Sequence, residues 1–357
     1  MEINISSCDS SLQKKPIDTP ANKIDLEQLR GPAHFVGIGG IGMSALARLL
    51  LARGKKVSGS DKKESEITVE LQEAGCEIHI GHAGANFSNA GCLVVSTAIT
   101  DDNPELVKAK ELGIPVLHRS EMLSALCRGR KLIGVSGTHG KTTTTGMVAQ
   151  LLIDANLDPS VVVGGIFNKI NSNARPGKGS FFVAEIDESD GTQTHVESYI
   201  SIITNIESDH LENYPGGLED IVSSMRKFAA NTTGTIVICA DDARCAQLQE
   251  EIATQPVVTY GKRSGTSQEQ GGRGADYTFE SVSTFGINIY KHGKLLGEIK
   301  LSVPGEHNKY NALATFVVGD LLGIDFKTIS ASLATFRGVN RRFQILGESK
   351  AVLVVDD

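Results

Sequence analysis

Short apolar runs alternate with longer segments of helical character along the first third of the chain. Residues 34–38 (HFVGI) form a strand-like run that leads into glycines, and residues 43–51 (MSALARLLL) have the apolar density of a helix packed on a sheet. Further strand-like runs follow, with helical or loop segments between them, at residues 56–60, 77–80, 93–96 and 115–117. Strands that alternate with helices in this way predict a parallel sheet of the α/β class.

The alternation starts again with a strand-like run at residues 131–135 (KLIGV), which also leads into a glycine-rich turn. A helix is predicted behind that turn at 143–155, where apolar side chains recur near helical spacing. The remaining predicted elements are strands at 181–185, 199–204 and 235–239, a β-rich segment at 257–303 with a mobile polar loop at 264–274, and helices at 308–322 and 327–336. A domain boundary is therefore expected near residues 125–130.

The charge balance and the composition exclude several classes of protein. With 42 acidic and 35 basic side chains, the net charge of −7 does not suit a general nucleic-acid binder. The chain has no apolar run of about 18 residues that would span a membrane, and residues 1–30 lack the apolar core of a signal peptide. The six cysteines are scattered without zinc spacing, as reduced thiols would be. We therefore expect a cytoplasmic protein with a flexible tail at residues 1–30.

The first glycine loop, residues 37–42 (GIGGIG), fits the G-x-G-x-x-G pattern between a strand and a helix. Glycines let the backbone approach a diphosphate, and the N-terminus of the helix supplies oriented N–H groups. Asp61 lies nineteen residues beyond Gly42, where an acid would bind a ribose in a dinucleotide fold. This chemistry serves any diphosphate, so the motif alone leaves an NAD-dependent dehydrogenase open.

The second glycine loop, residues 137–142 (GTHGKT), places Gly-Lys-Thr at a strand-to-helix junction, as a P-loop requires. The strict G-x-x-x-x-G-K-[ST] pattern fails narrowly, because Val135 stands where its first glycine would be. Backbone N–H groups of the loop can still cradle phosphates. The Lys141 ammonium can reach the β- and γ-phosphate oxygens, and the Thr142 hydroxyl can bind Mg²⁺. The sequence therefore predicts a Rossmann-like parallel-sheet domain followed by a P-loop ATPase α/β domain.

Acidic residues and a histidine follow two later strands of the predicted second sheet. The run at 183–190 (VAEIDESD) ends an apolar strand in four carboxylates. Glu185, the last residue of that strand, is the natural second ligand for a phosphate-bound Mg²⁺. His210 comes after the next strand along the chain. Because ligands gather at the carboxyl ends of parallel strands, we expect Glu185 and His210 near the second glycine loop.

Taken together, these motifs resemble those of the ATP-dependent Mur ligases. The resemblance rests first on residues 34–43 (HFVGIGGIGM), 137–145 (GTHGKTTTT) and 184–190 (AEIDESD). Supporting matches are found at 172–175 (SNAR), 205–210 (NIESDH), 304–308 (PGEHN), Asn311 and 341–343 (RRF). They follow one another over nearly the whole chain after residue 30, so the resemblance is specific.

The resemblance also implies which residues form the sites. The uridine diphosphate of the substrate, rather than NAD, would be bound by Gly37, Gly39, Gly40, Gly42, Asp61, Asn173 and Arg175. ATP would be bound by Gly137, Thr138, His139, Gly140, Lys141, Thr142 and Thr143, with Asn308 and Asn311 near its adenine or ribose. Mg²⁺ would be held by Thr142, Glu185 and His210. The catalytic residues would be Lys141, Glu185, His210 and Arg341, the last of which would reach the transferred phosphate.

For the whole protein, the resemblance implies three domains and a ligation reaction. We expect a UDP-binding Rossmann-like domain at 31–128, a central ATPase domain at 129–338, and at 339–357 a linker with the first strand of a truncated C-terminal domain. That strand, at 351–355 (AVLVV), is expected to be a buried parallel strand. The implied reaction uses ATP and Mg²⁺ to join L-alanine to the lactoyl carboxylate of UDP-N-acetylmuramate through an acyl phosphate. A monomer or weak homodimer is expected, and the chain alone is expected to be inactive.

Three other functions stay open on the sequence. A related ligase adds a recycled peptide to the same nucleotide sugar, but such ligases usually carry Tyr where this chain has Ser189. An NAD-dependent oxidoreductase could be built on the first glycine loop. A non-catalytic nucleotide-binding module would fit a chain that lacks a third domain. Product analysis, nicotinamide binding and ATP turnover would distinguish these three functions from the expected one.

Overall fold

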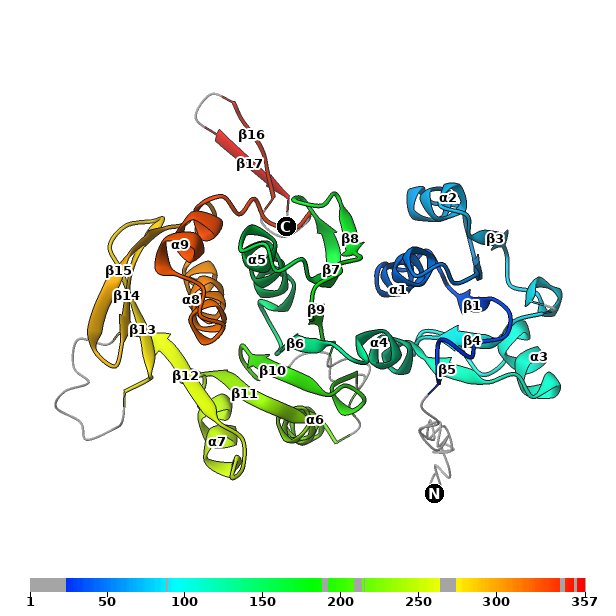
Figure 1. The fold of residues 1–357 in the computed structure, drawn as a ribbon, viewed down its shortest axis with the longest axis horizontal. Helices are drawn as coiled ribbons and strands as arrows, with labels where there is room; N and C mark the ends of the chain where they lie inside the picture. Colours follow the sequence, from blue (N-terminus) through cyan, green and yellow to red (C-terminus); the bar gives the residue numbers. More distant parts are fainter. Residues whose placement is uncertain are drawn as a thin grey trace, which may run out of the picture.

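The computed structural model describes residues 24–340, apart from 88, 188–191, 209–213, 215 and 264–273, and the backbone of 344–349 and 352–356. The chain forms two α/β domains, each built on its own sheet (Figure 1), so the predicted fold class is confirmed. The expected boundary near residues 125–130 falls between the last helix of the first domain and the first strand of the second. The predicted mobile loop at 264–274 lies almost wholly outside the described residues.

The first domain is a five-stranded parallel sheet in the order β3-β2-β1-β4-β5. Its strands are β1 (Ala33–Val36), β2 (Val57–Asp61), β3 (Glu77–Ile80), β4 (Cys92–Val95) and β5 (Val116–His118). Its helices are α1 (Ile41–Ala52), α2 (Glu66–Glu73), α3 (Pro104–Leu112) and α4 (Arg119–Cys127), with a 3-10 turn η1 (Gly84–Phe87). The first glycine loop joins the buried central strand β1 to α1, as the sequence predicted.

The second domain is a ten-stranded sheet in the order β15-β14-β13-β12-β11-β10-β6-β9-β7-β8. Pairing is parallel from β13 to β7, and it is antiparallel at the two edges. The strands are β6 (Lys131–Ser136), β7 (Ser160–Phe167), β8 (Ser172–Arg175), β9 (Phe181–Glu185), β10 (Ser198–Ile203), β11 (Thr232–Cys239), β12 (Val257–Lys262), β13 (Tyr277–Ser281), β14 (Gly286–Lys291) and β15 (Lys294–Lys300).

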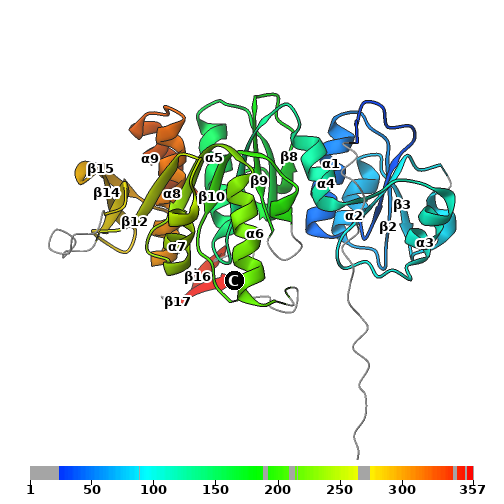
Figure 2. The same ribbon diagram turned by 90° about the horizontal axis from the view of Figure 1, so that it is seen from below.

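Helices cover both faces of the second sheet (Figures 1 and 2). They are α5 (Lys141–Asp154), α6 (Leu218–Ala230), α7 (Ala243–Glu251), α8 (Glu306–Leu321) and α9 (Phe326–Ala334), with a 3-10 turn η2 (Thr192–Thr194). Apolar side chains of α5, α8 and α9 form a core on one face, and those of α6 and α7 pack on the other. The carboxyl ends of β6, β9, β10 and β11 therefore meet at one edge, in front of α5.

The two domains are packed against each other through helix α1. This helix contacts β7 and β8 at the edge of the second sheet (Figure 2). One buried apolar cluster runs from α1 through Val162 and Ala174 into the second domain. The first glycine loop therefore lies beside the second domain. Over the described residues, none of the helices has the length and apolarity needed to cross a bilayer.

Two parts of the chain differ from the sequence-based expectations near its ends. The expected flexible tail includes Leu26, which is only 5% exposed and packs with Ile24 and Leu29 against the core of the first domain. Three apolar side chains in this short stretch are enough to anchor it. At the other end, β16 (Gln344–Ser349) and β17 (Val352–Asp356) form an antiparallel pair, so the expected parallel pairing is wrong. The connection between them is too short for a parallel crossover.

Candidate functional site

The second glycine loop joins β6 to α5 in a conformation that only glycine adopts easily. Gly137 has a φ of 130° and Gly140 a φ of 83°, both in the region that L side chains rarely occupy. A Cβ on Gly137 would overlap the Thr204 hydroxyl, and a Cβ on Gly140 would lie 2.6 Å from the Asn311 Oδ1. The glycines are therefore required both by backbone conformation and by close packing.

The exit of β10 holds this loop in place through hydrogen bonds. The Thr138 N–H donates to the Asn205 carbonyl at 3.0 Å, and the His139 N–H donates to the Asn205 Oδ1 at 2.8 Å. The Asn205 Nδ2 donates back to the His139 carbonyl at 3.0 Å, and the Glu207 N–H donates to the Thr138 hydroxyl at 2.8 Å. The loop is therefore held in one conformation before any phosphate arrives, which lowers the entropic cost of binding one.

Lys141, the first residue of α5, folds its side chain over the loop. Its ammonium donates to the Gly137 carbonyl at 2.7 Å and to the Thr138 carbonyl at 3.0 Å. A lysine in this position can neutralise phosphate oxygens that the loop N–H groups cradle. The predicted phosphate-binding role of Lys141 and its loop thus fits the observed geometry.

Thr142 and Glu185 are brought together as the sequence predicted. The Thr142 hydroxyl donates to the Glu185 Oε1 at 3.0 Å, and the Gly164 N–H donates to the Glu185 Oε2 at 2.8 Å. Burial raises the pKa of Glu185, and this effect outweighs the Gly164 N–H, the Lys141 charge and the Thr142 hydroxyl. A half-buried carboxylate beside a hydroxyl is the kind of oxygen donor set that Mg²⁺ prefers, and a cation there would stabilise the charge of the carboxylate.

Two other predicted site residues, His210 and Arg341, lie outside the described residues. Within the part of the chain that is described, no group of three or more His, Cys, Asp or Glu side chains could hold a metal ion. Of the three residues expected to hold Mg²⁺, the structure therefore describes Thr142 and Glu185, and the metal-binding and catalytic roles of all these residues stay predictions.

A cavity of about 480 Å³ opens beside the loop, between α8 and the ends of β10 and β11. Thr143, Asn308 and Asn311 line it, as expected for residues that would contact the nucleotide. The Asn311 Nδ2 donates to the Asn308 Oδ1 at 3.2 Å, and the Thr144 hydroxyl donates to the Asn311 Oδ1 at 3.1 Å. These bonds tie the cavity wall to α5.

The cavity also includes residues that the sequence analysis did not single out. Asp241 accepts a hydrogen bond from the Tyr310 hydroxyl at 2.7 Å, and both residues line the cavity together with Asp242 and His307. Asp241 and Asp242 lie two and three residues beyond the end of β11. The same rule that identified Glu185, namely that ligands gather at the carboxyl ends of parallel strands, would have found them.

The first glycine loop is linked to the end of β2 through Asp61. The Gly39 N–H donates to the Asp61 Oδ2 at 2.9 Å, so this carboxylate lies against the loop. Gly37 has a φ of 77°, and Gly40 is the N-cap of α1. The N-terminus of α1, including Gly42, therefore faces the same region as the loop, as a diphosphate site requires.

Of the two residues predicted from the second domain for this first site, one reaches it. Asn173 on β8 is 1% exposed, and its Nδ2 donates to the Ile41 carbonyl at 2.7 Å and to the Ser44 hydroxyl at 2.8 Å. Arg175 instead donates to the Pro159 carbonyl and the Asp158 carboxylate. Asn173 thus lies at the start of α1, whereas Arg175 is engaged elsewhere and its role stays a prediction.

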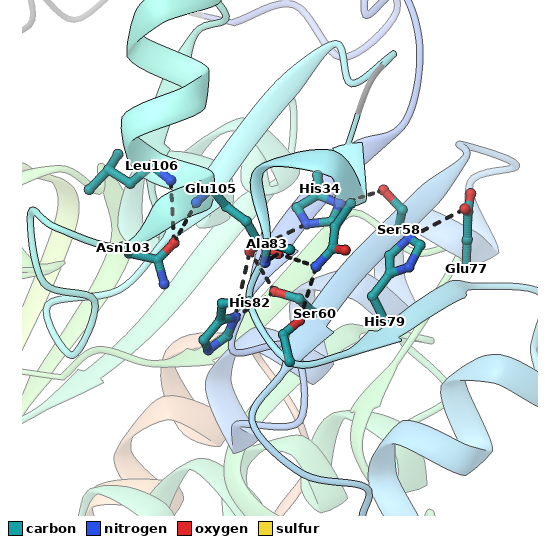
Figure 3. A network of polar contacts seen from close by, with 12 residues as sticks. His34, Ser58, Ser60, Glu77, His79, His82, Ala83, Asn103, Glu105 and Leu106 are labelled. Atoms are coloured by element: carbon teal, nitrogen blue, oxygen red, sulfur yellow. Dashed lines mark hydrogen bonds and ion pairs between the residues drawn. The ribbon is translucent and has the colours of Figure 1, made fainter.

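A buried polar network surrounds Glu105, in the first turn of α3 in the first domain (Figure 3). Glu105 is fully buried and accepts hydrogen bonds from the Ser60 hydroxyl and the Asn86 Nδ2, both at 2.6 Å. The His34 Nε2 lies 3.7 Å and the His82 Nδ1 3.6 Å from its Oε2. Although burial raises the pKa of Glu105, its interactions with His34, Ser60 and Asn86 lower it below the usual range. Ser60 precedes Asp61, so the network supports the end of β2.

Comparison with known proteins finds a family whose models match both domains of this chain. A model described as "Mur ligase family, catalytic domain" matches residues 32–131, and one described as "Mur ligase middle domain" matches residues 135–319. The UDP-N-acetylmuramate--L-alanine ligase of Geotalea daltonii is 45% identical over 326 residues, which cover 91% of this chain and 70% of that protein.

Solved structures agree with this match. The UDP-N-acetylmuramate-alanine ligase of Thermotoga maritima is 36% identical with a TM-score of 0.78, and the match covers 91% of this chain and 74% of that one. A murein peptide ligase of Psychrobacter arcticus also has a TM-score of 0.78, at 25% identity, over 92% of this chain and 72% of that one.

Proposed function

Because this chain belongs to the Mur ligase family, we propose that it provides the two nucleotide-binding domains of an ATP-dependent ligase that joins L-alanine to UDP-N-acetylmuramate. Relatives that carry this activity in their names are 42–45% identical and match 91% of the chain. The observation that carries the proposal is the contact of Thr142 with Glu185 beside Lys141, in front of a preformed phosphate loop. A dehydrogenase built on the first glycine loop would not require this arrangement at the second loop.

The chemistry follows from the difficulty of the reaction. A carboxylate is a poor acceptor for an amine, because an oxide would have to leave. Transfer of the γ-phosphoryl group of ATP to the lactoyl carboxylate gives ADP and an acyl phosphate. The amine of L-alanine then attacks the acyl carbon, the carbon–oxygen bond to phosphate breaks, and inorganic phosphate leaves. Positioning and charge neutralisation dominate such transfers, and Lys141 is placed to supply both.

The proposed Mg²⁺ site uses oxygen donors of this chain. Thr142 and Glu185 would hold the ion, together with His210 by prediction. The ion would supply neutralisation of charge on the ATP phosphates. Glu185 is half-buried, and desolvation outweighs its hydrogen-bond donors, so a cation bound there would also remove the cost of its charge.

The uridine diphosphate would lie at the first glycine loop, against the N-terminus of α1. Asp61 and Asn173 support this position, because they contact the loop and the first turn of α1 from β2 and β8. Since the domains pack through α1, the two nucleotides would bind on either side of one interface. Closure of that interface is how ligases of this kind would bring the reacting groups together.

The same proposal covers amino-acid choice, assembly and location. Identity to the alanine-adding enzyme of Thermotoga maritima is 36%, against 25% to the murein peptide ligase, which favours L-alanine as the second substrate. A monomer or weak homodimer in the cytoplasm, acting without nucleic acid or membrane, fits substrates that are small and water-soluble.

A thermal-shift panel with UDP-N-acetylmuramate, Mg-ATP and NADH tests the proposal on this chain. A ligand at about 100 times its dissociation constant stabilises a protein by roughly 2.7 kcal/mol, which is easily measured. Stabilisation by the nucleotide sugar and by Mg-ATP, but not by NADH, is expected. Stabilisation by NADH alone would overturn the proposed ligase function.

The Lys141→Ala substitution tests whether Mg-ATP and UDP-N-acetylmuramate bind at separate sites. We expect the variant to lose about 100-fold in Mg-ATP affinity, because each charge-assisted contact to phosphate contributes roughly 1.5–3 kcal/mol. Binding of UDP-N-acetylmuramate should change less than two-fold. Lys169→Ala is the matched control, since Lys169 pairs with Asp154 at the far end of α5. Loss of both ligands together in Lys141→Ala would contradict separate sites.

A further inference from the structure

Arg119 lies against the first glycine loop. It is the first residue of α4, directly after β5, and its side chain is 22% exposed. A Cβ built on Gly42 would lie 2.5 Å from the Arg119 Nη1, so the absence of a side chain at Gly42 makes room for the guanidinium. This places a permanent positive charge at the first turn of α1, beside the proposed diphosphate position.

The same guanidinium reaches across to the second domain. Its Nη2 donates to the Asp187 Oδ2 at 2.8 Å, and the Asp187 side chain is 37% exposed. Asp187 follows β9 and lies two residues beyond Glu185, the proposed metal ligand. One ion pair thus links the diphosphate loop of the first domain to the strand end that carries Glu185.

Other contacts hold the interface without this pair. The Ser120 hydroxyl and the His195 Nδ1 are 3.0 Å apart, and the Asn173 Nδ2 bonds to the start of α1. The apolar cluster around Val162 and Ala174 is also continuous between the domains. Replacement of Arg119 therefore leaves most of the interface in place, so its effect on ligand binding can be measured in a folded protein.

We propose that Arg119 binds the diphosphate of the nucleotide substrate and that Asp187 competes with this diphosphate for the guanidinium. This inference rests on the proposed function, because it needs a diphosphate at the first loop. A diphosphate carries more charge than a carboxylate, and a guanidinium binds its oxygens in a bidentate manner. The N-terminus of α1 attracts the same anion. Exchange of partners then releases Asp187 beside Glu185, so the second site responds when the first is filled.

The competition predicts opposite effects of two substitutions on binding of uridine diphosphate, measured by titration calorimetry. Arg119→Gln should weaken binding about ten-fold. Arg119→Lys should weaken it less, because lysine keeps the charge but cannot donate two parallel hydrogen bonds as a guanidinium does. Asp187→Asn should tighten binding about two- to five-fold, since a partly exposed ion pair no longer has to be broken. In the Arg119→Gln background, Asp187→Asn should have no further effect.

The matched controls are Arg226→Gln and Glu251→Gln, which break an exposed arginine–glutamate pair between α6 and α7. Both should leave uridine diphosphate affinity unchanged. Equal weakening by Arg119→Gln and Asp187→Asn would show that the pair only fastens the domains, and it would overturn the competition. Absence of binding to the unmodified chain would instead overturn the proposed function, so the two failures are distinguishable.

Discussion

Each domain holds one glutamate in a polar site, fully buried Glu105 in the first and half-buried Glu185 in the second, and the surroundings shift the two pKa values in opposite directions. Burial alone raises the pKa of Glu105 and of Glu185. In the first domain, hydrogen bonds from His34, Ser60 and Asn86 outweigh burial, and the pKa of Glu105 falls below its usual range. Glu105 is thus a carboxylate whose charge the native fold stabilises.

Glu185 is half-buried and has fewer hydrogen-bond donors than Glu105. The Gly164 N–H, the Thr142 hydroxyl and the Lys141 charge act on it, yet burial dominates and the pKa of Glu185 is raised. The negative charge of Asp187 raises it further. The native fold therefore carries this ionised carboxylate at a cost in free energy, which a bound cation would remove.

The difference separates a structural glutamate from a functional one. A buried charge with enough hydrogen bonds specifies the fold around it, whereas one that is short of partners indicates a site that is completed by a ligand. We propose that Glu105 belongs to the first kind and Glu185 to the second. Substitutions at the two positions should then change stability and binding in opposite ways.

The largest expected effect is on nucleotide binding in Glu185→Gln. This variant removes the proposed metal ligand, so we expect Mg-ATP affinity to fall at least about 100-fold. The free protein should become more stable by about 1 kcal/mol, or roughly 2–4 °C in Tm, because an incompletely paired buried charge is gone. Thermal melts with and without Mg-ATP measure both quantities.

Glu250→Gln is the control for this substitution, since Glu250 is an exposed residue of α7. It should change neither the Tm nor the response to Mg-ATP. A Glu185→Gln protein that is less stable than the unmodified chain would show that Glu185 is structural, and the contrast with Glu105 would then be lost.

The next effect is on stability in Glu105→Leu. This change leaves the Ser60 hydroxyl, the Asn86 amide and the Ala83 N–H without their buried acceptor. We expect a loss of about 3 kcal/mol or more in the free energy of unfolding of the first domain, measured by urea denaturation. The response of the folded protein to Mg-ATP should be retained.

Glu111→Leu provides the comparison on the same helix, because Glu111 is exposed and pairs only at the surface with Lys108. Its expected cost is below about 1 kcal/mol. Similar losses from both leucine variants would mean that the network around Glu105 adds little, and that its lowered pKa has no consequence for the fold.

The sequence predicted Glu185 but not Glu105, and the reason is physical. Glu185 ends an apolar strand next to a recognisable glycine loop, so position alone placed it at the ligand edge of the sheet. Glu105 receives its hydrogen bonds from residues 60, 83 and 86, with His34 and His82 close by, and these residues are brought together only by folding. The role proposed for Arg119 was not predicted from the sequence for the same reason, since its neighbours Gly42 and Asp187 lie on two other segments.

The strands of the fold show the same limit on what local sequence can predict. Strands with continuous apolar character, such as β6 and β9, were predicted within about one residue of their observed bounds. The edge pair β7 and β8 was not predicted, because it contains Gly164 and Gly165 and ends in polar residues. Its pairing depends on α1 packing against it, which is a long-range contact. Local pattern therefore identified the centre of the second sheet better than this edge of it.

The smallest expected effect is on the acid stability of the first domain. Because the pKa of Glu105 is lower in the folded state than in the unfolded one, the native state binds fewer protons at this residue. Its contribution is fully present above the unfolded pKa, near the ordinary value of 4.5, and is lost as the pH falls through the folded value. Urea midpoints of the unmodified chain and of Glu105→Gln should therefore differ at pH 7 and at pH 5, with the variant less stable.

Below the ordinary pKa of glutamate the two midpoints should converge, because the protonated Glu105 and the substituted glutamine are both neutral. Other carboxylates titrate in both proteins, so their contributions cancel in the difference. A gap that stays constant down to pH 3 would mean that the loss in Glu105→Gln comes from packing rather than from charge. Glu105 would then no longer be the charged counterpart of Glu185.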